Sequence, residues 1–168
     1  IIFKWKKAAN ASGYKIYRRT GNSSKWVNIA TVSGSNTLVY TDGSVKAGTM
    51  YTYTVRAYEG SALSAYNKNG SRIVRLTAPV QYKPSSKASG KLTVRWKKAA
   101  GASGYQIQYA ASRSMRGSRT VSASALTRTL SGLKKGSTYY VRIRAYKKAS
   151  GKTYYGAWSS VKNAKVRK

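Results

Sequence analysis

A ten-residue phrase that occurs twice constrains the fold of this chain more than any other feature of its sequence. WKKAANASGY at positions 5–14 returns as WKKAAGASGY at positions 96–105, with one residue changed. A second phrase follows each copy in the same order, as GTMYTYTVRAY at 48–58 and as GSTYYVRIRAY at 136–146. Repetition that preserves the order of its landmarks indicates two copies of one structural unit. The sequence therefore predicts a tandem pair of domains.

Each copy alternates apolar and polar residues as a half-buried β-strand does. Apolar residues recur at every second position over 1–5 and 92–96, and again over 51–57 and 139–145. This period of two places one set of side chains in a core and the other set in water. Clusters of Ser, Gly, Asn and Lys separate the segments as turns, and no long amphipathic helix pattern is present. We therefore expect an all-β chain of two small antiparallel β-sandwiches.

The landmarks of each copy resemble those of the fibronectin type III domain. They are a Trp that ends one strand, a short loop to Gly-Tyr, and an L-x-x-G-x-x-Y segment that enters a later strand. Leu133, Gly136 and Tyr139 match the last of these, and VKAGTMY at 45–51 matches it with Val in place of Leu. The resemblance implies two immunoglobulin-like sandwiches and covers nearly the whole chain.

The resemblance also implies roles for four aromatic residues. Trp5 and Trp96 are expected in the cores, and Tyr51 and Tyr139 are expected to be tyrosine-corner residues whose hydroxyls bond to nearby backbone. More narrowly, the W-K-K-x-x-x-A-S-G-Y wording is similar to lysine-rich type III repeats in secreted and cell-surface proteins of Gram-positive, clostridia-like bacteria. Such repeats are mostly spacers between active modules. The resemblance therefore implies a spacer in an extracellular, cell-surface protein.

The two copies differ at their start. The first begins at the strand that ends in Trp, strand B of the family, whereas PVQYKPSS at 79–86 can supply strand A of the second copy. We expect that strand A of the first domain was cut away with upstream sequence, so that the chain is an excerpt flanked by neighbouring domains of one polypeptide. Alternatively, another segment or a neighbouring chain fills the open edge, as in a surface filament. The expected domains are 1–76, starting at strand B, and 77–168.

The composition excludes most catalytic chemistry. His and Cys are absent, and Asp42 and Glu59 are the two acidic residues set against 33 Lys and Arg. General acid–base catalysis and metal binding both depend on the residue types that are scarce here. SGYK at 12–15 lacks the companion motifs of S-x-x-K enzymes, and SGKT at 150–153 lacks the first glycine of a phosphate-binding loop. We expect a chain that is not an enzyme and that uses no cofactor or metal.

The formal net charge of +31 is the main clue to partners. Basic residues are spread over the loops of both copies, so they do not form a single basic tail. Such a surface favours anionic polymers, namely wall teichoic acid, sulfated host glycans or non-specific nucleic acid, with affinity that falls as salt rises. The alternative is that the charge only provides solubility and protects strand edges. No nucleic-acid recognition motif occurs, and no apolar run approaches the ~20 residues of a membrane span.

One face of the second copy is a candidate binding site. Arg142 and Arg144 lie two residues apart on a predicted strand, so both project from the face opposite the core, flanked by Tyr140 and Tyr146. Trp158, on the expected neighbouring strand, is placed to stack with both guanidinium groups. This arrangement is either an internal Arg–Trp–Arg stack or an exposed platform for a carbohydrate or a host protein, and the sequence leaves both open.

Overall fold

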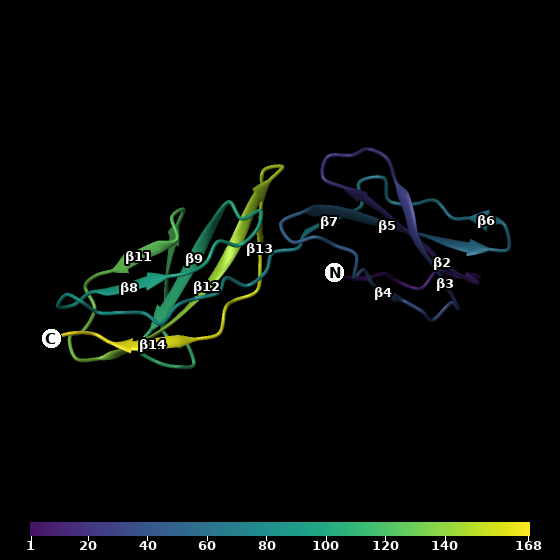
Figure 1. Cartoon of the computed structure of the whole chain (residues 1–168). Coiled ribbons are helices and arrows are strands. Elements are labelled where there is room, and N and C mark those ends of the chain that lie inside the picture. Colours follow the sequence, from purple (N-terminus) through teal and green to yellow (C-terminus); the bar gives the residue numbers. More distant parts are fainter. The chain divides into compact units, whose positions relative to one another are not determined.

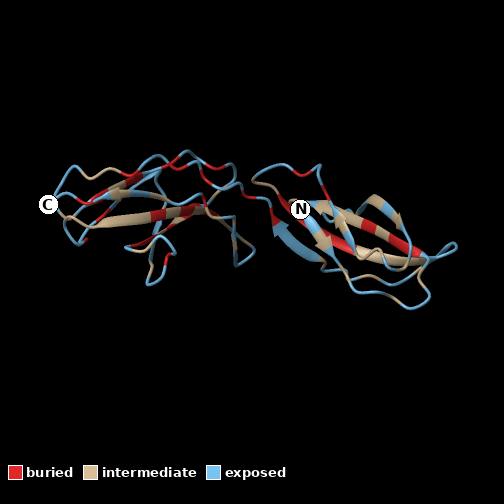
Figure 2. Ribbon diagram, turned by 90° about the horizontal axis from the view of Figure 1, so that it is seen from below, coloured by how far each residue is buried: buried red, intermediate tan, exposed pale blue.

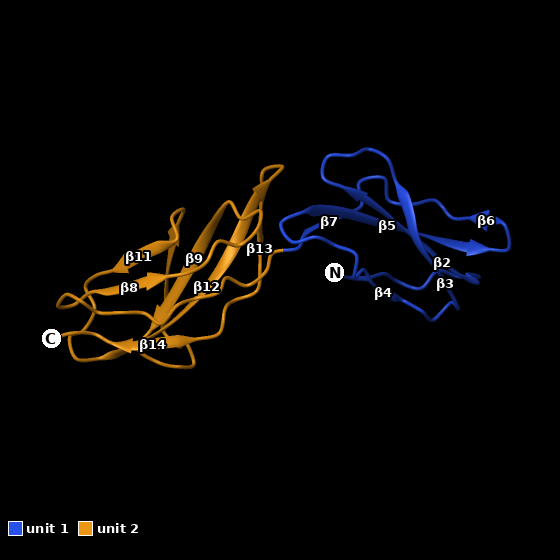
Figure 3. Cartoon of the chain, viewed as in Figure 1, with its two compact units in different colours: residues 1–75 blue, residues 76–168 orange.

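The computed structural model describes residues 1–168, which form fourteen β-strands and no helix (Figure 1). Buried residues occur on the strands of both halves of the chain (Figure 2). The chain divides into two compact units, Ile1–Arg75 and Leu76–Lys168 (Figure 3). The all-β architecture agrees with the prediction, and the division falls one residue before the expected boundary.

Unit 1 packs a two-stranded sheet against a larger sheet. In the small sheet β1 (Ile2–Lys4) pairs antiparallel with β4 (Val39–Thr41). The larger sheet contains β3 (Val27–Ser33), β2 (Gly13–Thr20) and β5 (Met50–Glu59) in that order, and both β6 (Ala62–Leu63) and β7 (Ser71–Val74) pair with β5. The two sheets meet where the Phe3 ring of β1 stacks on the Tyr53 ring of β5, with the ring centroids 5.5 Å apart.

Unit 2 repeats this arrangement and adds one segment to its small sheet. β8 (Leu92–Arg95) pairs with β11 (Thr127–Leu130). The larger sheet contains β10 (Arg119–Ala123), β9 (Gly104–Ala110) and β12 (Thr138–Ala149), and both β13 (Lys152–Tyr155) and β14 (Lys162–Lys165) pair with β12. Residues 81 and 85 form bridges to Trp96 and Thr93 along the outer edge of β8. That edge is therefore covered, whereas no strand pairs with the matching edge of β1.

The first repeated phrase forms the same joint in both units. In unit 2 the Trp96 and Tyr105 rings pack with centroids 5.3 Å apart, and the Tyr105 hydroxyl accepts a hydrogen bond from Ala99 N at 2.9 Å. In unit 1 the Trp5 and Tyr14 rings are 5.4 Å apart, and the Tyr14 hydroxyl likewise accepts a backbone N–H. Each Lys-Lys pair lies exposed on the loop that this tyrosine closes. The phrase recurs because each unit needs the loop once.

The glycine of this phrase is explained by the tyrosine that ends the second phrase. A Cβ atom on Gly104 would collide with the ring and hydroxyl of Tyr146, and one on Gly13 would collide with Tyr58. Close packing leaves no space for even one added carbon at such a contact. In each unit the glycine of the first phrase packs against the last tyrosine of the second, which explains why the two phrases recur together.

The two predicted core tryptophans differ in burial. Trp96 keeps 2% of its surface exposed, whereas Trp5 is only half-buried and packs at the border of the unit 1 core. The physical reason lies in the small sheet, because the segment that covers the edge of β8 has no counterpart beside β1. Trp5 thus packs against the unit 1 core with part of its ring exposed.

Candidate functional site

Basic and aromatic side chains stack on the outer face of the larger sheet of unit 2. The Cζ atoms of Arg142 and Arg144 lie 4.8 Å and 4.5 Å from the centroid of the Trp158 ring. Arg144 Cζ also lies 4.0 Å from the centroid of Tyr155, whose ring meets that of Tyr146 at 6.1 Å. These distances lie within the range of cation–π attraction. We call Arg142, Trp158, Arg144 and Tyr155 the ladder.

Two glutamines on β9 hold the guanidinium groups of the ladder. In the register of β9 and β12, Gln108 lies opposite Arg142 and Gln106 lies opposite Arg144. Arg142 Nε donates to Gln108 Oε1 at 2.7 Å, and Arg144 Nε and Nη2 donate to Gln106 Oε1 at 2.9 Å and 2.7 Å. Hydrogen bonds of this kind fix the plane of a guanidinium group. The ladder is therefore ordered by contacts within the chain.

The sequence placed Trp158 on a regular strand, and this is wrong. Trp158 lies in the connection between β13 and β14. Gly156 N donates to Ala145 O, and Ser159 N donates to Ile143 O. The chain advances three residues from Gly156 to Ser159 while β12 covers only the two residues from Ala145 to Ile143. The extra residue has the effect of a β-bulge, which turns a side chain towards a new direction.

The structure changes the membership of the predicted face. Arg142, Arg144, Tyr146 and Trp158 come together, but Tyr140 makes no ring contact with them. Sequence reasoning missed Tyr155, Gln106 and Gln108. The spacing of QIQ on one strand and RIR on the next was the available signal, because residues two apart share a face.

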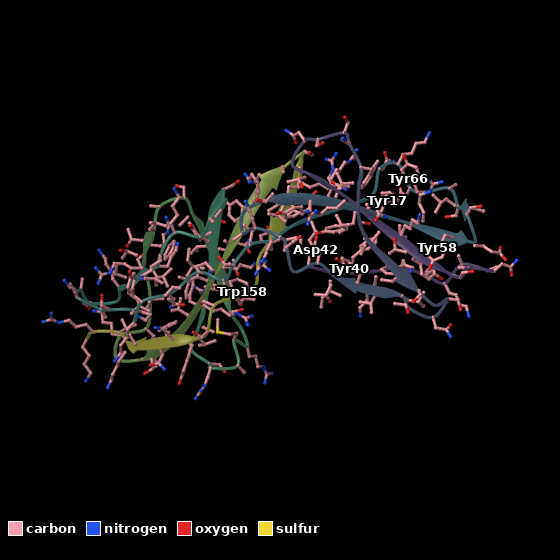
Figure 4. The ribbon with its side chains drawn as sticks, turned by 45° about the vertical axis from the view of Figure 1, so that its right-hand side comes forward. Tyr17, Tyr40, Asp42, Tyr58, Tyr66 and Trp158 are labelled. Atoms are coloured by element: carbon pink, nitrogen blue, oxygen red, sulfur yellow. The ribbon has the colours of Figure 1, made fainter.

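Unit 1 carries a related but different cluster at the corresponding place. Arg56 Cζ lies 5.4 Å from the centroid of the Tyr66 ring, and Arg19 Cζ lies 4.7 Å from that of Trp26. The rings of Trp26 and Tyr66 meet edge-on at 6.2 Å. A recess of about 90 Å³ is lined by Trp26, Arg56, Tyr66 and Tyr17, and Tyr17 lies near Tyr66 (Figure 4). The recess is too small to enclose a drug-sized ligand.

Asp42 has a structural environment. Its side chain is 2% exposed and accepts hydrogen bonds from Arg18 Nη1 at 2.6 Å, Tyr53 Oη at 2.8 Å and both N and Oγ of Ser44. Burial raises the pKa of Asp42, but the hydrogen bonds from Ser44, Tyr53 and Arg18 outweigh this effect and lower the pKa to about 2. Burial and the neighbouring carboxylate raise the pKa of Tyr53. The carboxylate thus stays ionised at neutral pH inside the fold.

The second acid lies apart from the first. Glu59 is exposed at the end of β5, and no three His, Cys, Asp or Glu side chains gather into a group that would hold a metal ion. A chain without helices also has none that would span a membrane.

Comparison with known proteins decides the family. The profile of the fibronectin type III domain matches residues 77–161. The chain belongs to the fibronectin type III family. Among solved structures, a two-domain fibronectin type III segment of chicken tenascin is similar, with 16% identity and a TM-score of 0.53 over 98% of this chain and 90% of that one.

A second solved structure, the FN1–FN3 domains of chicken CNTN1, matches with 21% identity and a TM-score of 0.46 over 99% of this chain. This chain spans 62% of the length of that one. No curated protein matches. The family match and the tenascin segment show tandem fibronectin type III sandwiches as the fold.

The tyrosines assigned to the fibronectin type III corner bond to the backbone in both units. Tyr51 Oη accepts a hydrogen bond from Lys46 N at 2.9 Å, and Tyr139 Oη accepts one from Lys134 N at 3.2 Å. In each case the donor lies five residues upstream, at the corner that precedes the long central strand. These hydrogen bonds make both residues part of the framework, with Tyr51 buried and Tyr139 half-buried.

Acid is expected to destabilise unit 1 through Asp42. The pKa of Asp42 is about 2 in the folded chain and near 3.8, the ordinary value for Asp, in the unfolded chain, so the carboxylate stabilises the fold above pH 3.8. This contribution of about 2 kcal/mol should be lost as the pH falls through the folded value, from about pH 4 to pH 2. Hydrogen exchange of the β5 amides measures it.

Unit 2 is the internal control for this experiment, because it has no acidic side chain. Its β12 amides should keep their protection over the same pH interval. Equal protection of β5 at pH 2 and pH 6 would show that the Asp42 carboxylate does not hold unit 1 together. The Asp42→Asn variant should lack the pH dependence in unit 1.

Proposed function

We propose that this fibronectin type III pair is a non-catalytic, extracellular spacer and adhesion module of a larger surface protein of a Gram-positive bacterium. We further propose that it associates with anionic polymers, whether wall teichoic acid, sulfated glycans or extracellular nucleic acid. The observation that carries the proposal is a formal charge of +31 on a fold whose carboxylates form no site. The family match supports a spacer or adhesion role.

The arrangement of charge supports association through many weak contacts. A single salt bridge, between Arg18 and Asp42, joins acidic and basic side chains. The lysine pairs of both repeated phrases are exposed, and so are Lys134 and Lys135 on a different loop of unit 2. A flexible polyanion that touches several such groups releases its counterions, and this release gives affinity without a defined pocket.

A second candidate is a specific binding module for a carbohydrate or a host protein at the ladder. The observation in its favour is Tyr155, which stacks on Arg144 and is 46% exposed. Against it, the Nε atoms of both ladder arginines are already bonded to Gln106 and Gln108. We favour a structural role for the ladder, in which the stack stiffens the outer face of unit 2.

Two charge-matched variants separate these candidates. Arg142→Gln with Arg144→Gln removes two charges from the ladder, and Lys134→Gln with Lys135→Gln removes two charges from a loop. If basic side chains over the whole surface contribute equally to binding, both double variants should weaken binding to heparin by the same several-fold factor. Isothermal titration at low salt measures this, with thermal unfolding as the check that each variant is folded.

A loss of binding confined to the folded arginine variant would overturn distributed binding in favour of a specific ladder site. Trp158→Ala provides a further comparison, because it removes the central ring of the stack and no charge. Distributed binding predicts heparin affinity unchanged by this substitution.

A further inference from the structure

The outer face of the larger sheet in unit 1 lacks one arginine that the ladder of unit 2 has. The repeat aligns Arg56 with Arg144 of the ladder. The other ladder arginine, Arg142, has the short and buried Thr54 as its counterpart. The central ring in unit 1, that of Tyr66, therefore stacks with one guanidinium group, whereas the central ring of the ladder stacks with two.

The residue on the neighbouring strand differs in the same way. In unit 2 Gln108 lies opposite Arg142 and accepts a hydrogen bond from its Nε. In unit 1 Tyr17 lies opposite Thr54. A glutamine amide that holds a guanidinium group is thus replaced by a tyrosine ring beside a short side chain. This exchange leaves room on the outer face of unit 1.

The recess of about 90 Å³ lies at this place. Three of its lining side chains are aromatic, Tyr17, Trp26 and Tyr66, and the fourth is Arg56. Tyr17 and Tyr66 lie near one another (Figure 4). An apolar cavity of about 150 Å³ takes up benzene, so a recess of this size suits a group of only a few heavy atoms. It can enclose one substituent of a ligand whose remainder stays outside.

The indole wall of the recess is held in place by contacts within unit 1. Arg19 Cζ lies 4.7 Å from the centroid of the Trp26 ring, and the same guanidinium group donates to a backbone carbonyl of the connection after β6. A Cβ atom on Gly70 would lie 2.7 Å from Trp26 Cη2, so the backbone packs directly against the indole. A site whose walls are already ordered loses little conformational entropy when a ligand binds.

The lining side chains keep hydrogen-bonding capacity for a ligand. Arg56 Nε donates to Ser64 O at 2.7 Å and Nη2 donates to Leu63 O at 3.4 Å, but Nη1 has no partner within the chain. The hydroxyls of Tyr17 and Tyr66 have no partner either, and both residues are half-buried. The recess thus combines apolar rings with a few directional polar groups, as small-molecule sites do.

These features favour a small neutral group with one acceptor and one methyl. A quaternary ammonium group suits aromatic walls, but Arg56 and Arg19 would repel it. A carboxylate pairs best with two donors of one guanidinium group, and Nε of Arg56 is already bonded. Its second oxygen would lose water against the aromatic rings without a replacement. An acetamido group meets both requirements, because its carbonyl oxygen accepts one hydrogen bond and its methyl group is apolar.

We propose that the recess binds the acetamido group of an N-acetylated amino sugar. The methyl group packs against Tyr17 and Tyr66, and the carbonyl oxygen accepts a hydrogen bond from Arg56 Nη1. The sugar ring stays outside the recess and lays its apolar face on the half-buried Trp26 ring, a flat surface that matches a sugar ring better than a flexible aliphatic chain. This ligand is neutral, so the site is separate from the association of the chain with anionic polymers.

The experiment titrates the full chain with N,N′-diacetylchitobiose in about 0.5 M sodium chloride, where association with polyanions is screened. The indole N–H signal of Trp26 in NMR spectra should shift and reach saturation. Cellobiose has hydroxyl groups in place of both acetamido groups, so it is the matched control and should cause no saturable shift. Heparin binding at low salt does not depend on this result, so a failure here is distinguishable from a failure of the proposed function.

Matched variants in the two units sharpen the test. Arg56→Lys keeps the charge but removes the Nη1 donor, and it should weaken binding of the disaccharide about tenfold. Arg144→Lys makes the same change at the counterpart in unit 2 and should leave the affinity unchanged. Tyr17→Ala removes one wall of the recess and should also weaken binding about tenfold. The remaining signals of the spectrum show whether each variant is folded.

Three results would overturn the proposal. The first is an equal shift with cellobiose, and the second is an affinity that Arg56→Lys leaves unchanged. The third is binding of an acetylated lysine amide as tight as that of the disaccharide, because the ligand would then be an acetylated peptide.

Discussion

The Asp42→Ala substitution is expected to lower the free energy of unfolding of unit 1 by about 3 kcal/mol. The carboxylate is 2% exposed and accepts hydrogen bonds from Arg18, Tyr53 and Ser44. Its removal leaves the buried Tyr53 hydroxyl without its acceptor and leaves the partly exposed guanidinium of Arg18 with Ser44 Oγ but no carboxylate. The cost exceeds that of one lost hydrogen bond because these groups stay desolvated.

Urea unfolding followed by exchange of the β5 amides measures this loss. Glu59→Ala is the matched control, because it removes the other acid from an exposed hairpin and should change the stability by less than about 0.5 kcal/mol. Equal effects of the two substitutions would mean that Asp42 acts only through net charge.

Trp96→Ala is expected to cost unit 2 about 3–5 kcal/mol, the usual range for an aromatic side chain lost from a core. The ring is 2% exposed and packs against Tyr105, which closes the loop of the repeated phrase. The cavity would lie under the segment 80–85 and loosen its bonds to β8. Unfolding of unit 2, followed by exchange of the β12 amides, measures the cost.

Trp5→Ala is the matched substitution in unit 1 and should cost clearly less. The Trp5 ring makes the corresponding contact with Tyr14 but is only half-buried. Less apolar surface is returned to water when a half-exposed ring is removed. Equal costs for Trp5 and Trp96 would contradict the argument that the burial of the ring sets the cost of its removal.

The strands and the pairing of units follow from the sequence because their signals are local. The alternation along 139–145 predicted which side chains point into the core, and Val141, Ile143 and Ala145 are indeed fully buried. In unit 1 the same reasoning placed Thr52 and Thr54 on an exposed face, which is wrong. Both are buried, since Thr54 Oγ1 donates to the carbonyl of Asn67 in the connection that crosses that face.

The ladder was only partly predictable, because it depends on contacts between strands. The spacing of Arg142 and Arg144 fixed their common face, but Gln106 and Gln108 meet them only in one register of β9 against β12. Trp158 reaches the stack through an irregular connection that alternation does not encode.

The central proposal is that charge spread over two fibronectin type III units, and not a defined pocket, binds anionic polymers. The most direct measurement is the affinity of the 168-residue chain for heparin across a sodium chloride series from about 0.05 M to 0.5 M. The logarithm of the affinity should fall linearly with the logarithm of the salt concentration, with a slope that corresponds to several released counterions. An affinity that stays constant across the series, or no binding even at the lowest salt, would contradict the proposal.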